Sequence, residues 1–351
     1  MNIIAENSKQ IDIAKNQLLK YVNNIDIDKL LISSYSKKYL LNYQLNSYYF
    51  INHYSQVFKK AISKINKPIN DISILDYGGG CGLMSILASL SGVKLIIYND
   101  IFETSCHDAQ IISKHLNQNI DYFVSGDVKE MVDFLKEKSL KVDLIISIDV
   151  LEHIYNLDQW FYELYKIDTP FTLYFNTGAN PKNPFIKKKL IKYQQIAELV
   201  GKVESWGWKE RDTNKPFIEA RKEIILKYHQ NLSKTDLELL AQKTRGLNKI
   251  DIENVTDVFV KTGTIAYKIS HPTNTCDPYT GNWTENLINL EKLLEMLNKL
   301  GFKATIENNN YILSNSRLKN LLKLIANTLI FFVKKENLLF SPTYSLMVKK
   351  D

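Results

Sequence analysis

The stretch Ile74-Leu-Asp-Tyr-Gly-Gly-Gly-Cys-Gly82 decides the fold of this chain. An apolar run that ends at Asp76 passes directly into glycines at alternate positions, Gly78, Gly80 and Gly82. Glycine lets the backbone adopt positive φ angles and approach a ligand closely, because it has no Cβ. A helix is predicted over residues 83–91, and the first N–H groups of a helix are free to bind a ligand. The pattern therefore predicts a strand, a nucleotide-cofactor loop and a helix.

The spacing of the glycines separates two classes of cofactor. The dinucleotide fingerprint is G-x-G-x-x-G, whereas the position three residues after Gly80 is Leu83. Asp76 would also repel a pyrophosphate but can receive the ammonium of an amino-acid-like ligand. The next predicted strand, residues 94–100, ends in Asp100, at the distance where an acid meets ribose hydroxyls in a doubly wound sheet.

Two further predicted strands also end in polar residues. Residues 120–128 contain Asp127, which can accept a hydrogen bond from an adenine amino group beside the apolar Val128. Gly126-Asp127 is also consistent with a simple turn and helix N-cap. The strand over residues 142–149 ends in Asp149 and is followed by Val-Leu-Glu-His-Ile154. Four strands thus end in polar groups at one edge of the predicted sheet.

In this order, the motifs Asp76-x-Gly78-x-Gly80-x-Gly82, Asp100, Gly126-Asp127 and Asp149-Val-Leu-Glu-His153 resemble those of class I S-adenosylmethionine-dependent methyltransferases. The Val-Leu-Glu-His-Ile segment is similar to the ubiquinone-biosynthesis branch. The resemblance covers about residues 70–178 and, more loosely, 284–351. It implies an α/β fold, a doubly wound, seven-stranded Rossmann-like methyltransferase sheet whose last strand is antiparallel. It also implies S-adenosyl-L-methionine as the cofactor, bound by Asp76, Gly78, Gly80, Gly82, Asp100, Ile101, Asp127, Val128 and Asp149.

The chain is expected to divide into four segments. Residues 1–69 form an N-terminal helical cap, in which His53 and Tyr54 are candidate pocket walls, although its many tyrosines also suit plain packing. Residues 70–180 form the cofactor-binding core, with a fifth strand at 171–175. Residues 181–283 form a helical insertion, a candidate substrate lid, because a structureless loop of this length is improbable in a compact domain. Residues 284–351 complete the sheet.

The C-terminal segment is predicted in more detail. A helix over residues 284–300 carries leucines on one stripe, with Thr284 as its N-cap and Gly301 as its stop. Strands are predicted at 303–307 and 345–349. Between them, helix 318–333 is apolar almost all round, so burial between layers or at a homodimer interface is expected, and a membrane surface is the alternative left open.

Two histidines are candidate general bases for methyl transfer. His153 follows the fourth strand, and His271 lies in a loop with Asp277, Tyr279 and Trp283 before the last long helix. Imidazole is well suited to accept a proton near neutral pH. On one helical face, Asp149, Glu152 and His153 could instead bind a metal, but no second matched pair supports this, and no metal is expected.

Composition narrows the classes of partner. The net charge is +7, yet the basic residues are scattered and the chain has no zinc spacing, aromatic RNA-binding signature or basic arm, so nucleic acid is not the expected partner. Three cysteines far apart in sequence and the absence of a signal-like N-terminus suit the cytoplasm. The apolar stretch 321–333 contains Lys323 and Asn327 and is too short for a transmembrane helix.

The resulting prediction is a methyltransferase acting on an oxygen or nitrogen of a small molecule or sugar-like metabolite. One alternative is an RNA or protein methyltransferase that docks through the basic residues around Lys187, Lys188, Lys189 and Lys192. The other is a non-catalytic module that binds S-adenosylmethionine.

Overall fold

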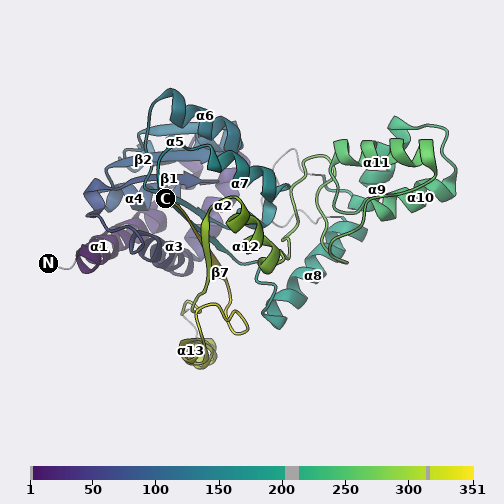
Figure 1. Cartoon of the computed structure of the whole chain (residues 1–351). Coiled ribbons are helices and arrows are strands. Elements are labelled where there is room, and N and C mark those ends of the chain that lie inside the picture. The colour runs from purple at the N-terminus through teal and green to yellow at the C-terminus, as the bar shows by residue number, and fades with distance from the viewer. Residues whose placement is uncertain (1–2, 202–212, 314–316) are drawn as a thin grey trace. The chain divides into compact units, whose positions relative to one another are not determined.

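The computed structural model describes residues 3–201, 213–313 and 317–351, which divide between two compact units (Figure 1). The core unit comprises Met1–Leu151, Asp158–Gly178 and Leu290–Asp351, and the insertion unit comprises Glu152–Leu157 and Ala179–Asn289. The bounds predicted for the helical insertion, 181 and 283, fall inside those of the insertion unit.

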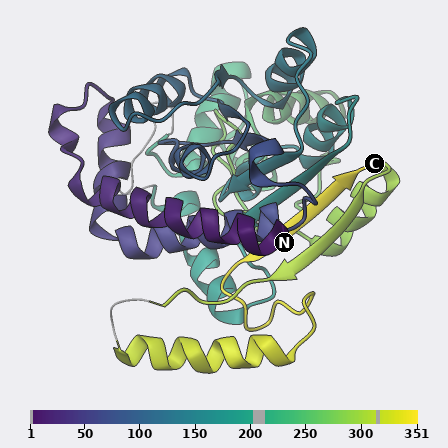
Figure 2. The ribbon, with the colours of Figure 1, turned by 90° about the vertical axis from the view of Figure 1, so that its left-hand side faces the viewer.

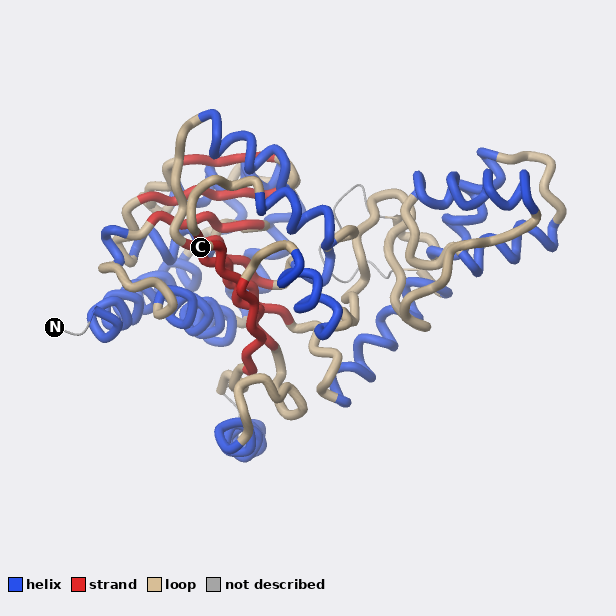
Figure 3. The backbone as a smooth tube through the Cα atoms, viewed as in Figure 1, coloured by secondary structure: helices blue, strands red, loops and turns tan. Residues whose placement is uncertain are grey.

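The core unit is built on a seven-stranded sheet in the order β3-β2-β1-β4-β5-β7-β6 (Figure 3). Its strands are β1 (Ser73–Tyr77), β2 (Leu95–Asp100), β3 (Tyr122–Ser125), β4 (Leu144–Ile148), β5 (Phe171–Thr177), β6 (Lys303–Asn308) and β7 (Tyr344–Lys350). Strands β1 to β5 pair in parallel, and β7 runs antiparallel to both β5 and β6. The predicted fold class is confirmed, including the antiparallel last strand.

The central strands form because both of their faces can be buried. All seven residues of β5 are buried, and so are the last four of β1. Parallel strands covered on both faces are expected to be continuously apolar in this way. The connecting helices are α4 (Leu83–Leu90), α5 (Glu103–His115), α6 (Val128–Glu137), α7 (Leu157–Tyr165) and α12 (Leu290–Lys299).

The N-terminal helices belong to the core unit. They are α1 (Ile3–Asn24), α2 (Ser34–Leu45) and α3 (Ser47–Ile62), with short 3-10 turns at Ile27–Lys29 and Ile69–Asp71. Helix α1 packs against α3 and α4 (Figure 2), and its buried stripe of Ile11, Ala14, Leu18 and Val22 joins the same apolar cluster as β1 and β2. The 3.6-residue spacing of this stripe is what makes α1 a helix with one buried face.

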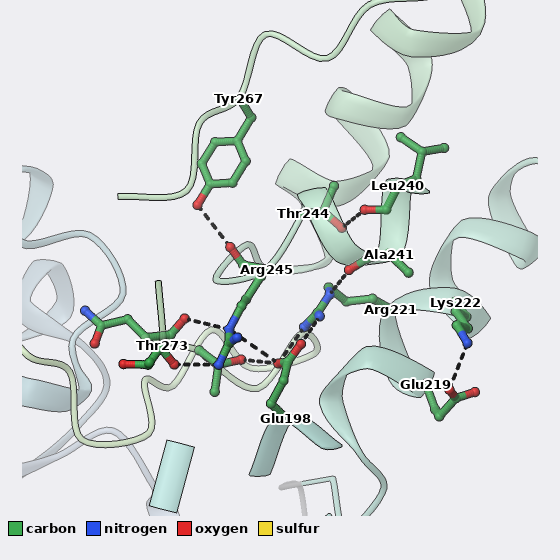
Figure 4. Close-up of polar contacts among 12 residues, drawn as sticks. Glu198, Glu219, Arg221, Lys222, Leu240, Ala241, Thr244, Arg245, Tyr267 and Thr273 are labelled. Carbon is green, nitrogen blue, oxygen red and sulfur yellow. Dashed lines mark hydrogen bonds and ion pairs between the residues drawn. The ribbon is translucent and has the colours of Figure 1, made fainter. Parts of the chain in front are cut away.

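The insertion unit is helical and is organised around a buried ion pair. Its helices are α8 (Pro184–Leu199), α9 (Phe217–Tyr228), α10 (Lys234–Lys243) and α11 (Lys249–Thr262). The guanidinium of Arg221 is fully buried and pairs with the carboxylate of Glu198, while its Nε donates to the Ala241 carbonyl at 2.8 Å (Figure 4). This one side chain therefore connects α8, α9 and α10.

Three expectations about local structure are wrong. Helix α12 begins at Leu290 rather than Thr284, because the Thr284 N–H donates to the Thr275 carbonyl at 2.9 Å in a short antiparallel contact beside the Cys276–Trp283 bridge. The third strand ends at Ser125, because the chain turns at Gly126 into α6. Helix α13 (Arg317–Phe332) is not buried between layers, since most of its large apolar side chains are exposed.

Candidate active site

The glycine loop after β1 adopts the positive φ angles that its sequence predicts. Gly78, Gly80 and Gly82 have φ angles of 69°, 54° and 76°, in the left-handed region that favours glycine. A Cβ on Gly78 would lie 2.6 Å from Val150 Cγ2, so no larger residue fits beside the segment that follows β4. At Gly80 a Cβ would meet no atom within 4 Å. The loop is thus packed on one side and open at Gly80.

Asp100 lies at the end of β2 and holds this loop directly. Its Oδ2 accepts the Gly80 N–H at 3.1 Å, and its Oδ1 accepts the Phe102 N–H at 3.0 Å. The residue is only 3% exposed. A carboxylate has about four lone-pair positions, so each oxygen keeps one for a further donor. Two vicinal hydroxyls, as in a ribose, fit this remaining capacity.

Asp76 has a different local role. Its Oδ2 accepts from both the backbone N–H and the hydroxyl of Ser85, at 3.1 and 2.7 Å, which ties the end of β1 to the first turn of α4. Burial raises the pKa of the Asp76 carboxyl to about 7, against the opposing effect of the Ser85 hydrogen bonds. Through these hydrogen bonds, Asp76 fixes the end of β1 and the start of α4 relative to each other.

Asp127 is the N-cap of α6. Its Oδ1 accepts the Lys129 N–H at 2.7 Å, and the Glu130 side chain accepts the Asp127 N–H at 3.0 Å, which completes a capping box. Asp127 therefore has the turn and N-cap role that its sequence also allowed. Val128 is buried beside it, and Ile101, after β2, is 49% exposed.

Asp149 follows β4 in a left-handed conformation, with φ of 52°. Its N–H donates to the Asn176 carbonyl on β5, and its Oδ1 accepts the Gly178 N–H, at 2.8 and 2.9 Å. Residues 149–153 do not form the helical face expected for a carboxylate–histidine cluster, because only Leu151–His153 form a 3-10 turn. Among residues 3–201, 213–313 and 317–351, no group of three or more His, Cys, Asp or Glu side chains is placed to hold a metal ion.

His53 on α3 lies against the same edge of the sheet. Burial lowers the pKa of its imidazole, while the Asp149 carboxylate and the Asn176 side chain act in the opposite direction. Its ring stacks parallel to that of Tyr49, with centroids 6.1 Å apart. His53, Tyr49 and Asn176 line one pocket of the core unit. The buried Asn176 Oδ1 accepts no hydrogen bond within the described structure.

From the sequence, His53 is expected only as a wall residue, and Asn176 is not singled out. A polar residue at the end of β5 follows the same rule as Asp76, Asp100 and Asp149 on the neighbouring strands, and this signal could have identified Asn176. The position of α3 beside β4 and β5 could not be predicted from the sequence, because these elements lie far apart in the chain.

Helix α2 begins over the glycine loop. The buried carboxylate of Asp108 on α5 accepts from both the N–H and the hydroxyl of Ser33, and it thereby fixes the start of α2. The Cys81 thiol, inside the loop, lies 3.8 Å from the Ser36 carbonyl oxygen. The cap segment therefore contacts the loop at Cys81. Tyr35 and Tyr39, one turn apart on α2, have ring centroids 4.7 Å apart.

The two predicted general bases, His153 and His271, lie in the insertion unit. His153 Nδ1 is 2.8 Å from the Trp283 carbonyl oxygen, and since a carbonyl can only accept, Nδ1 donates this hydrogen bond. His271 Nδ1 faces the N–H and hydroxyl of Thr273 in its own loop, at 3.3 and 3.2 Å.

The loop that carries His271 is tightly held. Asp277 is completely buried and accepts the N–H groups of Thr213, Tyr279 and Thr280. Trp283 stacks on Tyr155, with centroids 6.0 Å apart, and donates to its carbonyl oxygen. These contacts give Asp277 and Trp283 structural roles inside the insertion unit.

Five parallel strands in the order 3-2-1-4-5, an antiparallel β7 between β5 and β6, and ordered polar groups at the strand ends define the class I methyltransferase architecture. Over 110 residues, 31% of this chain, the sequence is 26% identical to a ubiquinone biosynthesis O-methyltransferase of Rickettsia akari. The match covers 41% of that relative, less than half its length. The structure therefore has the fold of class I methyltransferases, and the matched segment is similar in sequence to that O-methyltransferase.

Comparisons with solved structures give distant overall likenesses. An S-adenosylmethionine-dependent methyltransferase from Mesorhizobium loti is 11% identical, with 84% of this chain and 98% of that chain covered and a TM-score of 0.38. Magnesium protoporphyrin IX methyltransferase from Synechocystis is 14% identical, with 96% and 100% covered and a TM-score of 0.38. No family model matches the chain.

Proposed function

We propose that this chain is a methyltransferase that uses S-adenosyl-L-methionine to methylate an oxygen or nitrogen of a small molecule or sugar-like metabolite. One observation carries the proposal: the nearly buried Asp100 carboxylate holds the open glycine loop at Gly80 and keeps unused acceptor capacity. This arrangement suits a nucleoside, and the relative from Rickettsia akari carries the name of an O-methyltransferase.

The residues present fit this cofactor. Asp100 would accept the ribose hydroxyls, and the loop from Gly78 to Gly82 would let the cofactor approach the backbone. Ile101 after β2, together with Asp127 and Val128 at the start of α6, would receive the adenine. Asp76 would contribute indirectly, because its hydrogen bonds hold the glycine loop to the start of α4. Asp149 would lie beside the methionine part of the cofactor. When bound, S-adenosylmethionine supplies a methyl group already activated by its sulfonium.

The chain's own task is to orient the acceptor and to take its proton. As the acceptor oxygen or nitrogen bonds to the methyl carbon, its proton must pass to a base. His53 is favoured for this role, because burial lowers the pKa of its imidazole, which favours the neutral form that can accept a proton, and because it lies beside Asp149 and Asn176 at the ends of β4 and β5. His153 and His271 are the two other candidates.

The proposal of a compact acceptor rests on the pocket walls. Tyr49, His53 and Asn176 combine aromatic and polar groups in the way that small-molecule sites do. The competing RNA or protein acceptor would use the lysines of α8. A steep loss of acceptor affinity with added salt would favour a nucleic acid.

The decisive experiment measures formation of S-adenosylhomocysteine while the protein is incubated with a library of hydroxylated and amino metabolites. We expect cofactor binding by calorimetry and turnover of at least one compact acceptor. Cofactor binding without turnover of any acceptor would favour the non-catalytic module. Binding of NAD with no binding of S-adenosylmethionine would refute the proposal.

The proton acceptor is identified with three matched variants, His53→Gln, His153→Gln and His271→Gln. Loss of the base is expected to lower turnover by about 10²- to 10⁴-fold with nearly unchanged cofactor affinity, and to remove the acidic limb of the pH–rate profile. A variant that only loses stability keeps that limb. Normal turnover in His53→Gln would exclude His53 from proton transfer.

A further inference from the structure

Helix α13 presents an apolar surface to solvent. Eight large apolar side chains on its sixteen residues are between 44% and 82% exposed: Leu318, Leu321, Leu322, Leu324, Ile325, Leu329, Phe331 and Phe332. In Figure 2 the helix lies at the bottom of the picture, below the sheet and the N-terminal helices of the core unit. Exposed apolar surface of this extent on one element marks an interaction site.

The polar side of α13 faces the protein, and this fixes which side is exposed. Asn327 exchanges two hydrogen bonds with the backbone of Tyr311, at 2.6 and 3.0 Å, and Lys323 donates to the Ile312 carbonyl at 2.6 Å. Ile330, on the same side, is 4% exposed. At 100° per residue, these three residues lie about 160° around the helix from the centre of the stripe formed by Leu318, Leu321, Leu322, Ile325, Leu329 and Phe332.

The charge around α13 distinguishes between two surfaces that could cover this stripe, a second copy of the chain and a lipid bilayer. Lys319, Lys323, Lys334 and Lys335 lie on or just after the helix, and no Asp or Glu occurs between Glu307 and Glu336. A second copy of α13 would bring the same positive charge to the contact. A bilayer with anionic headgroups offers both apolar depth and opposite charge.

We propose that α13 docks flat on the surface of an anionic lipid bilayer, with its apolar stripe between the headgroups. No helix in the described part of the chain is long and apolar enough to cross a membrane. The sixteen residues of α13 span about 24 Å, which suits a helix lying in the interface. Lysine side chains can bury their methylene stems and reach the phosphates with their ammonium groups.

The test is co-sedimentation of the full chain with vesicles of phosphatidylcholine alone or of phosphatidylcholine with 30–40% phosphatidylglycerol, about the range that gives a strongly anionic surface. We expect binding that strongly favours the anionic vesicles. The double variant Leu322→Ser/Phe332→Ser and the charge variant Lys319→Glu/Lys334→Glu should each weaken it by about tenfold or more. Leu31→Ser, at an apolar side chain 87% exposed elsewhere in the core unit, is the matched control and should bind as the wild type does.

The competing occupants give different results. All substituted residues are exposed, so the variants should keep the wild-type circular dichroism spectrum and unfolding temperature. A dimer in light scattering that becomes monomeric in Leu322→Ser/Phe332→Ser, with no vesicle binding by the wild type, would overturn the proposal in favour of a second copy. A monomer that binds neither kind of vesicle would also overturn it.

Discussion

Replacing Asp100 by Asn should weaken cofactor binding more than it disturbs the fold. The carboxylate accepts two backbone N–H groups, from Gly80 and Phe102, and is proposed to accept the two ribose hydroxyls as well. An amide of the same shape keeps one accepting oxygen and turns an N–H₂ group toward donors. Hydrogen bonds to a charged group contribute about 1.5–3 kcal/mol, so the dissociation constant should rise about 10- to 150-fold.

The assay is titration calorimetry with S-adenosylmethionine and S-adenosylhomocysteine, on protein shown by circular dichroism to be folded. The matched control is Asp143→Asn. Asp143 also holds a backbone N–H, that of Ser73 at 2.9 Å, but at the start of β1, the end of the strand opposite the glycine loop. Its replacement should change stability while leaving the dissociation constant within about twofold, a difference below 0.5 kcal/mol.

An unchanged dissociation constant in Asp100→Asn would refute the reasoning, because the nearly buried carboxylate would then make no differential contact with the ligand. Equal losses in Asp100→Asn and Asp143→Asn would refute it in another way. The effect would then reflect a general loosening of the sheet rather than the ribose contact.

Two further predictions concern buried charges. The raised pKa of Asp76 makes its ionisation unfavourable in the folded state, so its contribution to stability is largest below the unfolded-state pKa of 3.8 and falls as pH rises toward about 7. From pH 5 to pH 8, the unfolding free energy measured in urea should fall by about 2–3 kcal/mol more for the wild type than for Asp76→Asn. Parallel pH profiles of the two proteins would contradict this. Arg221→Met removes the closest cation from the buried Glu198, which keeps Arg245 at 3.9 Å and the Thr275 hydroxyl as partners, and should cost about 3–5 kcal/mol. Lys222→Met, the control, breaks pairs with the partly exposed Glu219 and Glu238 and should cost less than about 1 kcal/mol in the same measurement, whereas equal losses would show that burial does not matter here.

The sequence by itself determined the features that depend on neighbours along the chain. Glycine at 78, 80 and 82 predicts positive φ angles because only backbone sterics are involved, and these angles are observed. The apolar runs predict the buried strands, and the resemblance carried by the ordered motifs implies a seven-stranded sheet with an antiparallel last strand, as observed. The predicted start of the last long helix was wrong. Thr284 has the residue type of an N-cap, but its N–H donates to the Thr275 carbonyl instead.

Only the tertiary structure decided the features that depend on segments far apart in the chain. It turned the Asp76 carboxylate toward Ser85, and it brought His53 of α3 beside Asp149 and Asn176. It also set which side of α13 is exposed, because Asn327 and Lys323 satisfy backbone groups of residues 311 and 312 and so hold the polar side inward. Helical periodicity states that a side is apolar, but the direction in which that side points is determined by contacts that periodicity does not encode.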